Sequence, residues 1–119
     1  MKMWSVMKAK EQEEAPVCQH FQRAAELLGK RWNTQIIRAL LSGASRFTDV
    51  RDAVPSLSDA LLSDRLKELE AEGILTRDVT PSTPVRIDYR LTEKGLDLTG
   101  AITELAGWAE RWAAADATS

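Results

Sequence analysis

The strongest nucleophile in the sequence is its single cysteine, Cys18, and His20 follows two residues later. A thiol near the N-terminus of a helix has a lowered pKa and reacts readily with oxidants and electrophiles. Lys30 and Arg31 lie nearby in the sequence and favour the thiolate in the same way. A lone cysteine on an apolar stripe, here shared with Phe21, is equally typical of a buried core. Cys18 is therefore a sensor of redox or electrophilic chemistry, a structural residue or a ligand contact.

Other reactive chemistry has little support. One Cys and one His among 119 residues are too few for a disulfide framework or an ordinary zinc site. The sequence has no Ser/His/Asp set, no paired-carboxylate site and no phosphate loop. We therefore expect no enzyme, no cofactor and no metal. Apolar runs are only a few residues long and no secretory signal is visible, so we expect a cytoplasmic protein without a membrane partner.

The basic residues are concentrated in two parts of a chain that is acidic overall. A formal net charge of −2 and a pI near 5.4 argue against a nucleic-acid partner. The segment charges are 0 for residues 1–22, +4 for 23–51, −4 for 52–72, +1 for 73–91 and −3 for 92–119. Basic segments thus lie on both sides of one acidic segment. Their contacts with DNA phosphates would orient a domain.

The spacing of apolar residues predicts the elements that position these groups. Helical periodicity begins after Pro16, continues through a second stretch and a short segment closed by Pro55, and reappears over residues 58–72. The period then changes to two, which predicts the strands of a hairpin at 74–79 and 85–91. Helices of this order followed by a hairpin and a last helix are typical of a winged helix-turn-helix.

We therefore predict a mainly α fold with a small β-hairpin. Residues 1–15 are predicted to be a flexible arm, 16–115 the folded domain and 116–119 a short tail. Thr92 is the predicted N-cap of a single last helix. The inner positions of that helix are predicted to be Leu98, Ile102, Leu105, Trp108 and Trp112.

The helix over residues 58–72 is the candidate for reading DNA. If Leu62, Leu66 and Leu69 are buried, it presents a polar face roughly 22 Å long to a major groove about 12 Å wide. The outward residues are Ser58, Asp59, Ala60, Ser63, Asp64 and Lys67. The candidates for contacts with the DNA backbone are Arg31, Arg46, Arg51 and Arg65, and those in the wing are Ser82, Thr83 and Arg86.

Two acidic residues on this face, Asp59 and Asp64, need an explanation. Either one of them accepts a hydrogen bond from a cytosine amino group, or both orient nearby arginines. The same face would be simply solvated in a winged helix that binds proteins. The basic flanks favour DNA over that alternative.

Several segments in the same order resemble the HxlR family of bacterial winged helix-turn-helix transcriptional regulators. They are Leu28-Gly29-Lys30-Arg31-Trp32, Arg46-Phe47, Leu62-Ser63-Asp64-Arg65-Leu66-Lys67-Glu68-Leu69-Glu70, Gly73-Ile74-Leu75, Thr83-Pro84-Val85-Arg86-Ile87-Asp88-Tyr89 and Leu91-Thr92-Glu93-Lys94-Gly95. The resemblance covers residues 18–112. It implies a DNA-binding homodimer with extra N- and C-terminal dimerisation helices, a recognition helix at 58–72 and a wing at 79–85.

Tryptophan content favours a dimer independently. The interior of a 119-residue chain is small for four tryptophans, so some are expected to pack across subunits. The candidates for the dimer interface are Trp4, Leu105, Trp108 and Trp112. The alternative is that Trp108 packs on the first helix of its own chain, and Trp32 is expected in the core.

Within the family, the chain is most similar to thiol-based repressors that sense quinones and diamide, through residues 28–33, 65–70 and 83–85. That similarity implies that Cys18 senses thiol-reactive small molecules. Some such sensors carry further cysteines in the C-terminal tail, and this chain has none. The remaining routes are a disulfide with Cys18 of the partner subunit, a mixed disulfide or S-alkylation.

The predicted function is a homodimeric repressor that binds a pseudo-palindromic operator in double-stranded DNA and responds to oxidants or electrophiles through Cys18. Two alternatives remain open. One is a winged-helix regulator with a structural cysteine and a non-thiol signal. The other is a protein-binding winged-helix module.

Overall fold

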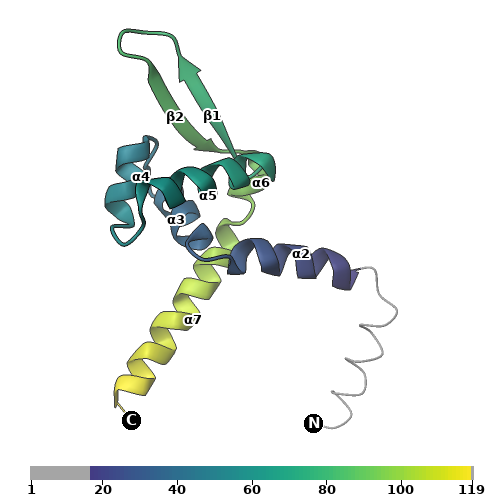
Figure 1. Ribbon diagram of the computed structural model, residues 1–119. Coiled ribbons are helices and arrows are strands. Elements are labelled where there is room, and N and C mark those ends of the chain that lie inside the picture. The colour runs from purple at the N-terminus through teal and green to yellow at the C-terminus, as the bar shows by residue number, and fades with distance from the viewer. Residues whose placement is uncertain (1–16, 119) are drawn as a thin grey trace. The chain divides into compact units, whose positions relative to one another are not determined.

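The computed structural model describes residues 17–118, so the predicted arm 1–15 and the candidate Trp4 lie outside the described residues. The elements are α2 (Val17–Gly29), α3 (Asn33–Leu41), α4 (Phe47–Ala53), α5 (Asp59–Ala71), β1 (Leu75–Thr80), β2 (Arg86–Leu91), α6 (Glu93–Leu96) and α7 (Thr99–Thr118) (Figure 1). The chain divides into two units between Arg31 and Trp32, with α2 in the first and all other elements in the second. The predicted mainly α fold with one hairpin is confirmed.

Aliphatic side chains hold the second unit together. Those that are almost fully buried are Ile36, Ile37, Val50, Leu62, Leu66, Leu69, Ile74 and Leu75. The three leucines of α5 are the predicted stripe, and burying each contributes roughly 1.5–3 kcal/mol. Because this stripe faces the core, the opposite side of α5 faces solvent.

Trp32 lies at the start of the second unit in a conformation that is rare for a residue with a side chain. Its φ of 79° is left-handed, and it precedes α3 directly. Its side chain is half-buried, so it is not the core residue that we expected. Ile36, four residues later, is fully buried, and its backbone N–H donates to the Trp32 carbonyl at 3.0 Å.

The C-terminal region contains two helices where one was expected. Thr92 is the N-cap as predicted, since its hydroxyl accepts from the Gly95 N–H at 3.1 Å, but it begins only the short helix α6. Gly95 lies so close to the hairpin that an added Cβ would overlap the Ile74 carbonyl oxygen. This close packing holds α6 at the base of the hairpin, and a new helix starts at Thr99.

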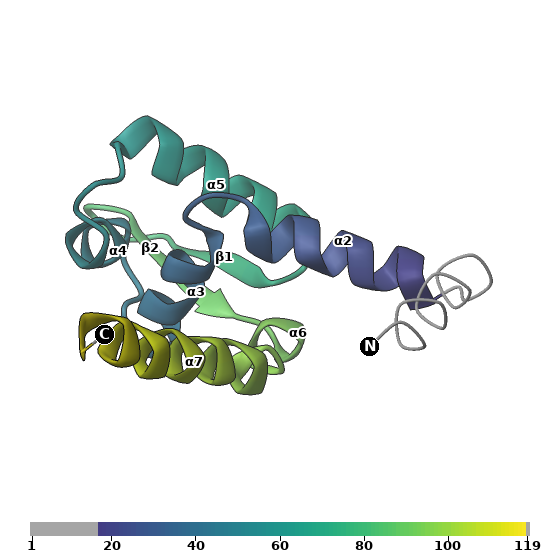
Figure 2. The same cartoon turned by 90° about the horizontal axis from the view of Figure 1, so that it is seen from below.

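α7 contacts α3, as Figure 2 shows from below, and its Ile102 is only 3% exposed. Three further residues predicted at inner positions, Leu105, Trp108 and Trp112, are exposed in the chain. α7 also continues into the predicted tail 116–119, as far as Thr118. None of the helices within residues 17–118 is both long enough and apolar enough to span a bilayer.

The hairpin is antiparallel, with Leu75 opposite Leu91 at its base and Thr80 opposite Arg86 near its tip. The middle of β2 is tied to the rest of the unit by a backbone hydrogen bond from the Tyr89 N–H to the Ser45 carbonyl at 2.7 Å. This bond joins the middle of β2 to the loop that precedes α4.

Candidate nucleic-acid interface

α4 and α5 form the predicted helix-turn-helix, and each begins with a polar cap. At α4 the Asp49 carboxylate accepts from the backbone N–H of Arg46 at 3.2 Å. At α5 the Ser58 hydroxyl accepts from the backbone N–H of Leu61 at 3.2 Å. These contacts satisfy N–H groups that have no partner within the helix. Ser58, a candidate for DNA contact, therefore also fixes the start of α5.

The outward face of α5 carries the other predicted base-contacting residues. Asp59, Ala60, Asp64 and Lys67 are exposed, and Ser63 is half-buried. The side chains of Ala60 and Ser63 are small, so another molecule can approach the helix backbone closely. The 13 residues of α5 span roughly 20 Å at about 1.5 Å per residue, which suits a major groove.

Asp59 lies in the first turn of α5 and forms an ion pair with α4. Arg51 Nη1 donates to Asp59 Oδ2 at 3.3 Å, and the two side chains are 41% and 61% exposed. A carboxylate in the first turn of a helix is also stabilised by the N-terminal end of the helix dipole. The geometry thus pairs Asp59 with a nearby arginine, which is one of the two possibilities expected for it. No such pair decides the role of Asp64, which stays a prediction.

The four candidate backbone arginines differ in how much of their side chains is accessible. Arg46 and Arg51 are 48% and 41% exposed. Arg65 is only 14% exposed, and its Nη1 lies 3.5 Å from a carboxylate oxygen of Glu68. Arg31 is exposed but belongs to the first unit. Of the three candidates in the second unit, Arg46 and Arg51 therefore have more exposed side chains than Arg65.

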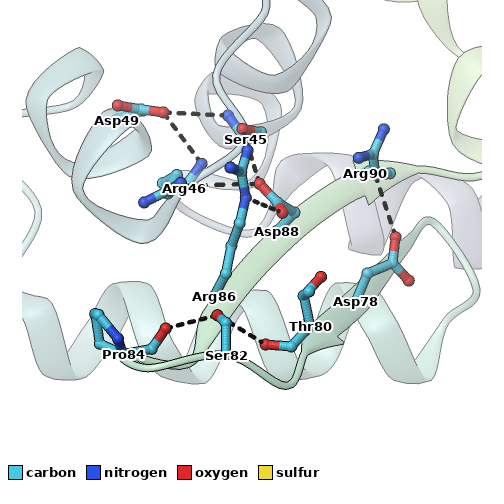
Figure 3. Close-up of polar contacts among 10 residues, drawn as sticks. All are labelled: Ser45, Arg46, Asp49, Asp78, Thr80, Ser82, Pro84, Arg86, Asp88 and Arg90. Atoms are coloured by element: carbon cyan, nitrogen blue, oxygen red, sulfur yellow. Dashed lines mark hydrogen bonds and ion pairs between the residues drawn. The ribbon is translucent and has the colours of Figure 1, made fainter.

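Asp88 is a buried carboxylate where the hairpin meets the helix-turn-helix (Figure 3). Its side chain is 6% exposed, and Arg86 Nε donates to its Oδ2 at 2.9 Å. The Ser45 hydroxyl donates to its Oδ1 at 3.3 Å, and Arg46 Nε lies 4.0 Å from the same oxygen. The hydrogen bond from Arg86 is the main cause that lowers the pKa of Asp88, although burial acts in the opposite direction. Asp88 is therefore held as an anion.

Sequence reasoning missed Asp88 and Ser45 as site residues. The alternation along residues 85–91 marks the charged positions as the outward face of a half-buried strand. At Asp88, in the middle of β2, that charged face instead meets Ser45 and Arg46 of the loop before α4. The only signal in the sequence is a single acidic residue between Arg86 and Arg90 on one face of the strand.

The tip of the wing presents small polar and apolar groups. The candidates Ser82 and Thr83 are exposed, and the Ser82 hydroxyl donates to the Pro84 carbonyl at 2.7 Å. Val79 and Val85 flank the tip and are 50% and 59% exposed. Arg86, the third candidate in the wing, is 52% exposed on β2.

The candidates for a dimer interface and a sensing thiol lie on the long helices. Leu105, Trp108 and Trp112 recur at three- and four-residue spacing along α7 and are 53%, 55% and 55% exposed. This spacing places them on one face of the helix. Cys18 belongs to α2, and its side chain lies outside what the structure describes.

Comparison with known proteins agrees with this geometry. The HxlR-like helix-turn-helix family matches residues 27–117. The chain is 46% identical over 99 residues to YvaP, an uncharacterised HTH-type transcriptional regulator of Bacillus subtilis (strain 168), a match that covers 83% of this chain and 92% of YvaP.

Two solved structures of YodB from B. subtilis are also similar. The diamide-treated form has a TM-score of 0.66 at 44% identity, covering 76% of this chain and 89% of that one. The quinone-bound form has a TM-score of 0.67 at 39% identity, covering 77% and 96%. YodB, like YvaP, is an HTH-type transcriptional regulator. By its sequence and its fold, this chain belongs to the HxlR family of helix-turn-helix transcriptional regulators.

Proposed function

We propose that this transcriptional regulator binds a pseudo-palindromic operator as a homodimer, represses transcription there, and releases the DNA when Cys18 reacts with an oxidant or electrophile. Membership of the HxlR family establishes that the chain is a transcriptional regulator. The operator, the dimer and the thiol signal each have support of a different kind.

The observation that carries DNA binding is the combination of an outward α5 face with accessible arginines in the same unit. Ala60 and Ser63 leave room for bases, while Arg46, Arg51 and Arg86 each keep 41–52% of the side chain exposed. Phosphate contacts position a DNA-binding domain, and contacts with base edges give it specificity. The guanidinium groups supply the first kind of contact and α5 supplies the second.

The exposed apolar face of α7 supports a homodimer. Large aromatic residues are enriched at the centres of protein interfaces and contribute much of the binding free energy. Trp108 and Trp112 are one turn apart and half exposed in the isolated chain. Two copies of such a face would cover each other across a twofold axis, which also matches a pseudo-palindromic operator.

The related YodB supports the thiol signal, because it has been solved both diamide-treated and quinone-bound. Cys18 is the only thiol of this chain, so every thiol reaction of the chain passes through it. Diamide takes two electrons and two protons from a pair of thiols, here Cys18 and Cys18 of the partner subunit or a small thiol, and forms a disulfide. A quinone instead adds to the thiolate and forms a C–S bond.

Binding to the DNA upstream of its own gene tests the first part. We expect the affinity to fall steeply with salt, with a slope near −0.9 in log–log form for each phosphate contacted. Arg46→Ala and Arg86→Ala should weaken binding to most sequences. Affinity that ignores both salt and these substitutions would contradict the proposal, and retention of a protein partner without any DNA would favour the protein-binding alternative.

Treatment with diamide or benzoquinone tests the thiol signal, with Cys18→Ser as the matched control. We expect the wild type to release DNA and to show either a disulfide-linked dimer on a non-reducing gel or the mass of a quinone adduct. Cys18→Ser should keep its DNA. If both proteins release DNA, or neither does, the cysteine is structural.

A further inference from the structure

Two aspartates are paired across the hairpin, and only one of them is buried. Asp78 lies opposite Asp88 in the register of β1 and β2, so both point to the same face. Asp78 is 51% exposed and forms an ion pair with Arg90, whose Nε lies 3.3 Å from Asp78 Oδ2, whereas the Asp88 side chain is 6% exposed. Like charges directly opposite each other destabilise a hairpin, and burying a carboxylate has a further cost. Asp88 therefore depends on partners that offset both effects.

Those partners come from both sides of one junction (Figure 3). Ser45 and Arg46 belong to the loop before α4, and Arg86 belongs to the wing. The backbone bond from the Tyr89 N–H to the Ser45 carbonyl joins the same two segments. One carboxylate thus connects the start of the helix-turn-helix to the wing.

The two arginines turn the same atom of the guanidinium group toward Asp88. Both present Nε to the carboxylate, Arg86 at 2.9 Å and Arg46 at 4.0 Å. A guanidinium has five N–H donors, and four of them are on the two Nη atoms. About half of each side chain is exposed, 48% for Arg46 and 52% for Arg86, and Nε is the atom that faces the carboxylate, so we take the Nη groups as the donors that a further anion would meet.

We propose that Asp88 is a positioning residue for DNA binding, which holds the wing against the start of α4 and directs the Arg46 and Arg86 guanidinium groups together toward the phosphate backbone. This inference rests on the proposed DNA binding. Asp88 itself does not touch DNA in this arrangement. Its effect is transmitted through the two arginines.

Asp88→Asn separates positioning from simple charge. Removing a negative charge by itself strengthens DNA binding, whereas releasing the two arginines from their anchor weakens it. At 0.15 M salt, the slope of −0.9 per phosphate corresponds to about fivefold in affinity for each phosphate that is no longer bound. We expect Asp88→Asn to bind about five- to thirtyfold more weakly and to have a shallower salt slope. Asp78→Asn, which removes the same charge from the opposite strand, should bind as well as the wild type or better.

Two further measurements separate positioning from a general loss of structure. In the Arg46→Ala/Arg86→Ala background, Asp88→Asn should cause no further fall in affinity. Amide hydrogen exchange at Tyr89, measured without DNA, should be faster in Asp88→Asn than in the wild type or Asp78→Asn. If Asp88→Asn does not fold, Ser45→Ala decides the matter, because it removes one hydrogen bond to the carboxylate without changing the net charge and is expected to weaken binding two- to fivefold.

The outcomes distinguish the two proposals. If the wild type fails to bind any DNA, including selected sequences from a random pool, the proposed function is wrong and the inference falls with it. If the wild type binds and Asp88→Asn binds as tightly as Asp78→Asn, only the positioning role is wrong. The role is also wrong if Asp88→Asn weakens binding equally with and without the two arginines.

Discussion

Replacement of Trp108 by alanine should disrupt the dimer without unfolding the subunit. Trp108 is 55% exposed in the isolated chain, so the substitution removes little from the core. An aromatic side chain buries up to about 250 Å² when fully covered, so about 140 Å² of Trp108 is available to a partner. A homodimer carries the change twice, and at about 25 cal/mol per Å² the loss is at most about 7 kcal/mol.

If a partner covers about half of that area, the loss is about 3.5 kcal/mol, or a several-hundredfold rise in the dimer dissociation constant. Sedimentation equilibrium measures this dissociation constant directly, because a dimer has twice the 13.2 kDa mass of the subunit. Leu105→Ala and Leu96→Ala form a matched pair. Both residues are 53% exposed, but only Leu105 lies on α7 beside Trp108.

We expect Leu105→Ala to weaken the dimer and Leu96→Ala to leave it unchanged. Thermal unfolding at several protein concentrations supplies the control for folding, because the midpoint of a dimer depends on concentration and that of a monomer does not. The reasoning is refuted if Trp108→Ala associates as tightly as the wild type. It is refuted equally if the wild type is a monomer at tens of micromolar.

Three other substitutions or conditions give clear expectations. Asp59→Asn should tighten DNA binding about fivefold at 0.15 M salt in an anisotropy titration, because Asp59 pairs with the outer Nη1 of Arg51 and competes with phosphate for it. Gly95→Ala should lower the free energy of unfolding by about 1–3 kcal/mol in urea, since the new Cβ would overlap the Ile74 carbonyl oxygen. Gly100→Ala should not lower the free energy of unfolding, because a Cβ added at Gly100 meets no atom within 4 Å. The pKa of Asp88 is lowered from 3.8, so the ionised carboxylate should stabilise the fold fully above pH 3.8 and cease to do so as the pH falls below that value. The difference in the free energy of unfolding between the wild type and Asp88→Asn, measured in urea, should therefore shrink at low pH.

Local patterns predicted the helix-turn-helix well. The buried side of the helix over 58–72 is marked by apolar residues at helical spacing, namely Leu62, Leu66 and Leu69. That spacing alone is enough to recognise a helix that packs on the core. The hairpin could be predicted equally well, because the alternation of its strands and its Pro-containing loop are local features. Ser58 and Thr92 were recognisable as caps for the same reason.

Features that depend on contacts between distant residues could not be predicted in this way. Ser45 and Asp88 are 43 residues apart, and only their contact turns a charged position of a strand into a buried one. The approach of Gly95 to the Ile74 carbonyl is another such contact, and no helical period reveals it or the end of α6 at Leu96. Leu105 and Trp108 were expected inside because a core and a dimer interface produce the same apolar spacing.

The acidic composition of the chain is compatible with DNA binding because of how its aspartates are used. Asp49 caps α4 and Asp88 accepts from the inner Nε of Arg86, so neither occupies an outer guanidinium edge. Each of these carboxylates lowers the net charge by one but leaves the phosphate-binding donors in place. Asp59 is different, since it occupies Nη1 of Arg51 and lowers the number of donors as well as the charge. The affinity for DNA should therefore follow the number of accessible Nη groups and not the net charge, and the opposite expected effects of Asp88→Asn and Asp59→Asn express that difference.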